Sequence, residues 1–252
     1  LGCDIITEKL DIPCGVLMGA NVASNVAAGE FTEATLALPS VVWDDFGIDF
    51  VNALQAALNL KTFIVNAVQD VPTAELCGSL KNVVALGAGF CDGNNFPIET
   101  KAAVMRMGLV EMEQFIKFFY PNANSNTLFE SCGFADLVTT CFGGRNRKCS
   151  EYFAKNYPDK VWEEIEKELL NGQKLQGTGA CEEVFNLLKS LDQLDRFPLI
   201  TQIHKIAYEN EKPTTITSEE VITAVNDNHP SNLERIANSP RKEMSAMQEA
   251  SD

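Results

Sequence analysis

The feature that most constrains this chain is residues 77–93, a run in which almost every side chain is apolar or absent. Lys81 and Asn82 stand inside that run. Lysine is among the residues least often buried, and burial disfavours its charged form. Two interpretations are open at this point. Lys81 has a chemical role, or its ammonium reaches solvent from the end of a core helix.

The backbone of this run also has two interpretations. Residues 83–89 look like a strand that enters a dinucleotide-binding glycine turn. That motif requires a third glycine where Asp92 stands, and an acidic residue at the end of a second strand about 20 residues on. Residues 101–120 have helical spacing instead. We therefore favour a helix over 73–90, whose glycines allow a neighbouring helix or a ligand to approach closely.

Composition and charge exclude some functions. The chain has 252 residues, 45% hydrophobic and 22% charged, which is typical of a globular protein. No apolar run approaches the ~20 residues of a membrane helix, so we expect no membrane partner. A net charge of −15 argues against a nucleic-acid partner, because phosphate backbones require a basic face. An anionic small substrate would need a local basic cluster, and residues 145–148 form one.

The cysteines and histidines do not form a metal motif. No two cysteines are spaced C-x-x-C, so we expect no metal site and read the thiols as reduced and cytoplasmic. Nucleophilic hydrolysis has little support, because the two histidines are His204 in an apparent helix and His229 near a polar end. The cysteines are Cys3, Cys14, Cys77, Cys91, Cys132, Cys141, Cys149 and Cys181.

The chain divides into three parts. Residues 1–70 alternate strand and helix, an α/β pattern too short for a complete doubly wound domain. Residues 71–230 are predicted to be all-helical, and residues 231–252 to be a polar, disordered tail. The predicted strands are 13–18, 32–38 and 63–68. The predicted helices are 4–11, 22–28, 50–60, 73–90, 101–120, 127–131, 161–170, 180–191, 198–209 and 218–225.

Three local signals mark the ends of these helices. Asn171-Gly172 predicts a helix stop, because both residues accept a left-handed backbone. Pro198 suits a first helical turn. Thr217 and Glu220 have the spacing of a capping box.

Residues 143–148, Gly-Gly-Arg-Asn-Arg-Lys, are the candidate anion site. Arg145 offers paired donors that suit a phosphate, and a helix starting near it would add free backbone N–H groups. The alternative is a solvated basic turn. The polar, glycine-containing segment 171–178 either borders a site or is a helix end with its linker.

Four segments together resemble the eukaryotic cytosolic NAD-dependent glycerol-3-phosphate dehydrogenases. They occur in the family's order, and residues 18–21 also resemble the last strand and turn of the family's dinucleotide domain. The resemblance covers residues 1–230, and the tail does not resemble the family's usual end. The four segments are 80–85 (LKNVVA), 130–137 (ESCGFADL), 139–147 (TTCFGGRNR) and 171–177 (NGQKLQG).

The resemblance implies a fold and a function. The fold is an α/β remnant of a Rossmann-like dinucleotide-binding domain, followed by an all-α domain like the C-terminal domain of 6-phosphogluconate dehydrogenase. The function is the interconversion of sn-glycerol 3-phosphate and dihydroxyacetone phosphate with NAD as cofactor. A cytoplasmic homodimer is also implied.

The resemblance also assigns roles to residues. Lys81 matches the acid/base lysine, and Asp136 a catalytic polar residue beside it. The substrate-binding positions are Asn82, Thr140, Arg145 and Asn146, and the last two hold the phosphate. The cofactor-binding positions are Ala23, Arg145, Lys174 and Gln176.

The chain departs from the family in one respect. It has no dinucleotide-binding glycine turn on a first strand, and no Leu-Ile-Lys-Gly motif with the family's other active-site lysine. We therefore expect it to correspond to the family's C-terminal part. An alternative is a non-catalytic paralogue or fragment that binds a phosphorylated metabolite or an oligomer partner. A structural helical protein is a third interpretation, but it leaves the Gly-Gly-Arg-Asn segment unexplained.

Overall fold

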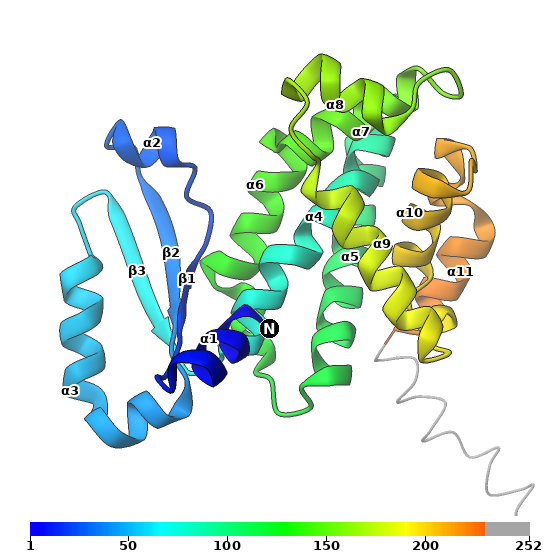
Figure 1. The fold of residues 1–252 in the computed structure, drawn as a ribbon. Coiled ribbons are helices and arrows are strands. Elements are labelled where there is room, and N and C mark those ends of the chain that lie inside the picture. Colours follow the sequence, from blue (N-terminus) through cyan, green and yellow to red (C-terminus); the bar gives the residue numbers. More distant parts are fainter. Residues whose placement is uncertain (230–252) are drawn as a thin grey trace, which may run out of the picture.

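The computed structural model describes residues 1–229, and a small sheet lies beside a larger helical body (Figure 1). Strand β2 (Thr32–Ala37) lies between β1 (Val16–Met18), its antiparallel neighbour, and β3 (Phe63–Val68), its parallel neighbour. The strands predicted over 32–38 and 63–68 are confirmed. The first strand begins three residues later than predicted, after Pro13, which has no N–H to donate to a ladder.

Helix α3 (Ser40–Leu58) covers one face of the sheet. Alternate residues of the parallel strands, such as Leu36 and Val65, are buried against α3. Gly47 adopts a φ of 74° and kinks the helix, so the helix predicted over 50–60 is only its second half. The short helices α1 (Gly2–Leu10) and α2 (Ala23–Ala27) flank β1, and both were predicted.

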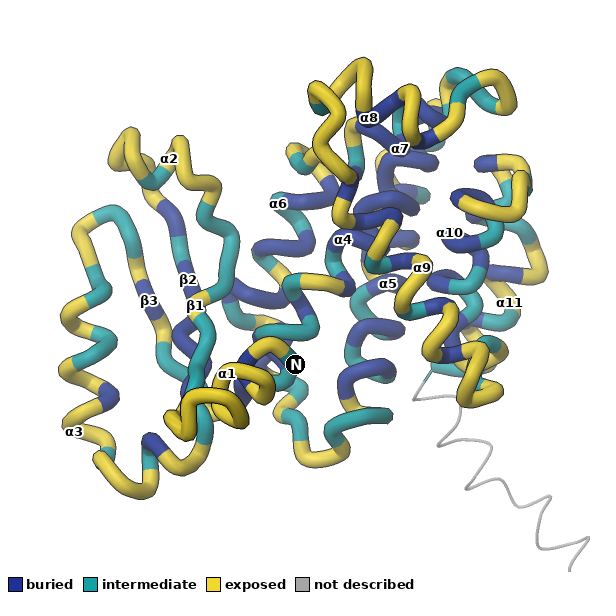
Figure 2. Tube along the Cα trace, in the orientation of Figure 1, coloured by how far each residue is buried: buried dark blue, intermediate teal, exposed yellow. Residues whose placement is uncertain are grey.

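Helix α4 (Val71–Gly93) is the axis of the helical body. The side chain of Asp70 caps it by accepting the Thr73 N–H at 3.2 Å. Figure 2 shows α4 buried along most of its length. The dinucleotide-turn interpretation is wrong, because residues 83–93 are helical. A Cβ on Gly89 would overlap Ser150 and the backbone of α7, so this glycine permits close helix packing.

The remaining helices pack around α4 or extend that core. Together they confirm an α/β part followed by an all-helical part. They are α5 (Ile98–Phe119), α6 (Asp136–Gly143), α7 (Arg145–Lys155), α8 (Trp162–Leu170), α9 (Gln176–Ser190), α10 (Pro198–Tyr208) and α11 (Glu219–Asp227). Short helical turns are η1 (Ser125–Phe129), η2 (Ser131–Ala135), η3 (Leu194–Arg196) and η4 (Pro213–Thr217).

Two of these helices were missed. Helices α6 and α7 fall in a segment expected to lie between helices, because Gly143-Gly144 punctuates it; a helix start near Arg145 was considered only as a condition for the anion site. Helix α9 begins four residues before the predicted 180, since Gly177 and Gly179 hide its first turn. In each case tertiary packing outweighs weak local propensity.

The helix-end signals mostly hold. Asn171 ends α8 with a φ of 51°, and Pro198 lies in the first turn of α10, as predicted. The capping box at Thr217 is wrong, because the N-cap of α11 is Ser218, whose side chain accepts the Val221 N–H at 3.4 Å.

Some sequence predictions lie beyond what the structure tests. The predicted tail, 231–252, lies outside the described residues, and the domain boundary at 70/71 stays a prediction. The eight cysteines are free thiols. Across residues 1–229, no helix has both the length and the apolar character needed to cross a membrane.

Candidate active site

Lys81 and Asp136 form an ion pair inside the protein. Lys81 lies in mid-α4 and Asp136 begins α6; their side chains are 17% and 7% exposed. Thr140, one turn along α6, donates its hydroxyl to the other oxygen of Asp136 at 3.4 Å. Burial raises the pKa of Asp136, and the charge of Lys81 acts in the opposite direction. The ammonium is therefore held by a buried carboxylate, not extended into solvent from a helix end.

Two asparagine side chains join three helices beside this pair. The Asn146 amide donates to the Asn82 side-chain oxygen at 2.7 Å, and its own oxygen accepts the Gly177 N–H at 2.9 Å. The Asn82 amide donates to the Gly78 carbonyl at 2.9 Å. These contacts fix the orientation of both amides across α4, α7 and α9.

A cavity of about 120 Å³ opens next to the asparagines. Helix α7 begins at Arg145 and α9 begins at Gln176, so two helix N-termini border it. The first N–H groups of a helix have no partner within the helix and carry its positive end. Such a cavity suits an anion. Its lining residues are Asn82, Thr140, Gly144, Arg145, Asn146, Lys174, Leu175 and Gln176.

The two cations at this cavity have different partners. Arg145 donates to the neutral side-chain oxygen of Gln173 at 3.0 Å, and no acidic partner for it occurs within residues 1–229. Lys174, with an 80% exposed side chain, pairs with the Glu166 carboxylate at 2.9 Å. That contact raises the pKa of Lys174. Arg145 therefore keeps positive charge available to a ligand.

Sequence reasoning missed Gln173 and Glu166. Gln173 lies in the segment 171–178 that was singled out, but no local feature separates it from its neighbours. Glu166 is one of four glutamates on α8, and it is the one turned inward. Only the tertiary structure distinguishes it.

The structure gathers most of the predicted residues and leaves one apart. Asn82, Thr140, Arg145, Asn146, Lys174 and Gln176 line one cavity. Lys81 and Asp136 adjoin it through Asn82 and Thr140. Ala23 is exposed at the start of α2, on the sheet side of the molecule, and the cavity does not include it (Figure 1).

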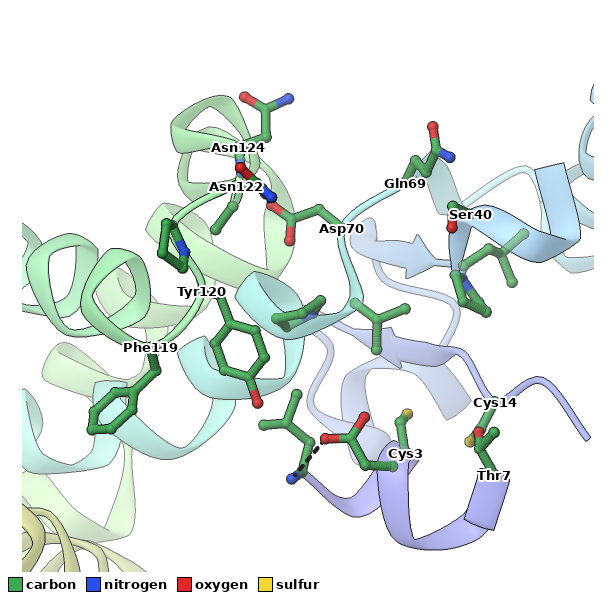
Figure 3. A pocket seen from close by; sticks show the side chains of 18 of the residues that line it. Cys3, Thr7, Cys14, Ser40, Gln69, Asp70, Phe119, Tyr120, Asn122 and Asn124 are labelled. Carbon is green, nitrogen blue, oxygen red and sulfur yellow. Dashed lines mark hydrogen bonds and ion pairs between the residues drawn. The ribbon is translucent and has the colours of Figure 1, made fainter. Parts of the chain in front are cut away.

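A larger cavity, of about 740 Å³, lies between α1, the start of α4 and residues 119–124 (Figure 3). It contains none of the predicted site residues. Its buried carboxylate, Asp70, is already engaged by the backbone N–H groups of Thr73 and Asn124, at 3.2 and 2.9 Å. Its size alone does not make it a site. Within residues 1–229, no group of three or more His, Cys, Asp or Glu could hold a metal ion.

The fold and the cavity together define a helical body that can hold an anion beside a buried lysine–carboxylate pair. The family described as "NAD-dependent glycerol-3-phosphate dehydrogenase C-terminus" matches residues 70–218. The chain belongs to the NAD-dependent glycerol-3-phosphate dehydrogenase family.

Several named proteins are similar to this chain. It is 49% identical over 212 residues to a cytoplasmic glycerol-3-phosphate dehydrogenase [NAD(+)] of Drosophila melanogaster, covering 84% of this chain and 56% of that protein. It is 47% identical to the human protein of the same name, and the match covers 82% of this chain and 57% of that protein. The structure of a Saccharomyces cerevisiae glycerol-3-phosphate dehydrogenase superposes with a TM-score of 0.81 at 38% identity, covering 87% of this chain and 62% of that one. The chain thus spans about three fifths of the length of the curated relatives it matches.

Proposed function

We propose that this chain supplies the substrate-holding and proton-transferring part of an NAD-dependent glycerol-3-phosphate dehydrogenase. The reaction interconverts sn-glycerol 3-phosphate and dihydroxyacetone phosphate. One observation carries the proposal: the buried Lys81–Asp136 pair adjoins a cavity bordered by Arg145 and two helix N-termini.

The cavity is assigned to the phosphate. Arg145 supplies charge-assisted donors, and the first turns of α7 and α9 supply backbone N–H groups. The volume of about 120 Å³ suits a small anion. Asn82 and Asn146 keep the walls in place through their mutual hydrogen bond. The chain's net charge of −15 makes this local positive potential necessary for an anionic substrate.

Lys81 is assigned the proton transfer. As an ammonium it donates a proton to the ketone oxygen during reduction, and as an amine it accepts the hydroxyl proton during oxidation. Asp136 holds and orients the Lys81 side chain, and Thr140 in turn holds Asp136. Proton donation by a positioned group typically contributes about 10²–10⁴ in rate.

The residues present fit an anionic dinucleotide cofactor. Lys174 and Gln176 are exposed at the cavity rim and offer a cation and an amide. When bound, NAD supplies or accepts the hydride. We assign Arg145, Lys174 and Gln176 to contacts with it from the helical side, and Ala23 to a contact from the sheet side.

The proposed location follows the names of the relatives. The curated relatives named above are cytoplasmic enzymes by name, and we extend that location to this protein. A homodimer stays a prediction from the resemblance.

A two-part experiment tests the proposal. For turnover, this chain is joined to a complete dinucleotide-binding domain and mixed with NADH and dihydroxyacetone phosphate, and absorbance at the NADH band should fall. Calorimetry should show glycerol 3-phosphate binding at least about 100-fold more tightly than glycerol, because the phosphate makes charge-assisted contacts. Binding without turnover would favour the non-catalytic alternative. If the protein shows neither binding nor turnover, both the proposal and the non-catalytic alternative are contradicted.

A further inference from the structure

Glu166 is a buried carboxylate that lies behind the candidate cavity. It is 5% exposed and belongs to α8. One carboxylate oxygen accepts the Leu175 N–H at 2.9 Å, and the other contacts the Lys174 ammonium at 2.9 Å. A single side chain thus holds the segment that leads into α9 through two groups, the backbone N–H of Leu175 and the ammonium of Lys174.

The start of α9 in turn holds the asparagine pair. Leu175 is the N-cap of α9, and the Gly177 N–H two residues later donates to Asn146. The fit is close, because a Cβ on Gly177 would lie 2.7 Å from the Asn146 side-chain oxygen and 2.8 Å from the Asn82 carbonyl. A small displacement of the start of α9 therefore breaks the Asn146 contact. The hydrogen bonds run from α8 through α9 and α7 to α4.

The other glutamates of α8 show how unusual Glu166 is. Glu163, Glu164 and Glu168 are exposed, as expected for a solvated helix face. Burying a carboxylate costs desolvation energy that an apolar side chain at the same place would avoid. Two contacts of Glu166 offset part of this cost, and both go to residues that line the cavity.

We propose that Glu166 is the positioning residue of this site, fixing the start of α9 and the Lys174 ammonium at the cavity rim. The proposal rests on the function proposed above. Glu166 does not touch the cavity, so it acts through Leu175 and Lys174. Loss of its carboxylate releases the α9 start and disorders the Asn146 contact, and the phosphate site weakens as a result.

Backbone amide hydrogen exchange tests the first part of this inference on the ligand-free protein. In Glu166→Ala, the Leu175 and Gly177 amides should exchange about tenfold faster or more, because each loses a bond that depends on the carboxylate. Glu166→Gln keeps one acceptor oxygen and should restore most of the protection. Glu168→Gln, an exposed position on the same helix, is the matched control and should exchange as the wild type does.

Lys174→Met separates the two contacts of Glu166. It removes the ion pair and leaves the Leu175 bond, so the Leu175 amide should stay protected. This variant and Glu166→Gln carry the test if Glu166→Ala fails to fold.

Calorimetry with glycerol 3-phosphate tests the second part. Glu166→Ala should weaken binding about tenfold or more, Glu166→Gln should weaken it less, and Glu168→Gln should bind as the wild type does. Unchanged amide exchange in Glu166→Ala overturns the inference. Faster exchange with unchanged affinity also overturns it, because Glu166 is then structural only. If the wild type binds no glycerol 3-phosphate, the proposed function fails, and the exchange measurement alone decides the inference.

Discussion

Two ion-paired clusters lie along α4, and they differ in whether a cavity lined by a cation without a carboxylate partner lies beside them. The first is the Lys81–Asp136 pair. The second is the Asp92 cluster, which consists of Asp92, Lys101, Arg147 and Glu151. In this second cluster Asp92 contacts Lys101 at 2.7 Å and Arg147 at 2.5 Å, and Arg147 also contacts Glu151 at 3.0 Å.

The charges of the Asp92 cluster are paired, and Glu151 also contacts Lys155, one turn further along α7, at 2.5 Å. Its cations and carboxylates pair with one another, joining α4, α5 and α7, and none of its members lines the cavity. The Lys81–Asp136 pair, by contrast, adjoins the cavity, where Arg145 contacts only a neutral amide among the described residues. Arg145 and Arg147 are two residues apart on one helix. Arg147 already has carboxylate partners and ties α7 to α4, whereas Arg145 has none among residues 1–229, so its charge is available to a ligand.

The largest expected effect separates the two lysines. In a complete enzyme, Lys81→Ala should lower turnover of dihydroxyacetone phosphate by about 10²–10⁴, because the proton donor is lost. Lys101→Met should leave turnover unchanged and lower the free energy of unfolding by about 1.5–3 kcal/mol, because one charged contact of Asp92 is lost. Steady-state kinetics measure the turnover of each variant, and urea unfolding measures its free energy of unfolding. Equal turnover in wild type and Lys81→Ala would end the catalytic assignment.

The second effect separates the two arginines. Arg145→Ala should weaken glycerol 3-phosphate binding about 10–100-fold, and Arg145→Lys should weaken it less, because lysine keeps the charge without the paired donors. Arg147→Met should lower stability and leave the affinity within about twofold. Calorimetry measures the affinity of the three variants for glycerol 3-phosphate. If Arg147→Met weakens binding as much as Arg145→Ala does, the distinction between the clusters fails.

The third effect concerns the packing of α7 against α4. Gly89→Ala should cost about 1–3 kcal/mol of stability, because its Cβ would overlap Ser150 where α4 meets α7. Gly143→Ala is the matched control, since a Cβ there meets no atom within 4 Å. Thermal unfolding should show a lower midpoint for Gly89→Ala alone. Equal midpoints would mean that α7 moves away from α4 without cost.

How much the sequence predicts follows from how local each signal is. The apolar run 77–93 favoured a buried helix and singled out Lys81, because a charge in such a run is conspicuous, but it left the role of the lysine open. The Gly-Gly-Arg-Asn segment predicted an anion site at Arg145. Both signals are contiguous in sequence, and the resemblance supplied the roles.

The contacts that complete the site are not local. Asp136 lies 55 residues from Lys81, and Gly177 lies 31 residues from Asn146. No spacing rule joins such pairs. Glu166 is hidden among exposed glutamates, and the inward face of α8 becomes visible only once the helix packs. Helices α6 and α7 have weak propensities, so their positions depend on tertiary burial.

The last effect extends the comparison to a buried acid that has no cation partner among residues 1–229. Glu111 is 2% exposed, and it accepts the N–H groups of Leu199 and Ile200 at 2.7 and 2.9 Å. Burial raises its pKa to about 8 from an ordinary value of 4.5. The folded state therefore keeps a proton that the unfolded state loses between these values. Stability contributed by this proton is complete below about pH 4.5 and declines as the pH rises to about 8.

Glu111→Gln removes this titration. The wild type should lose up to ~1.4 kcal/mol of unfolding free energy per pH unit relative to the variant within that window. Urea unfolding at pH 5, 6, 7 and 8 measures the difference between the two proteins, and titrations common to both cancel. Parallel curves would show that Glu111 is ionised in the folded protein despite having no cation beside it. The helix N-terminus of α10 would then compensate its charge as Lys81 compensates that of Asp136.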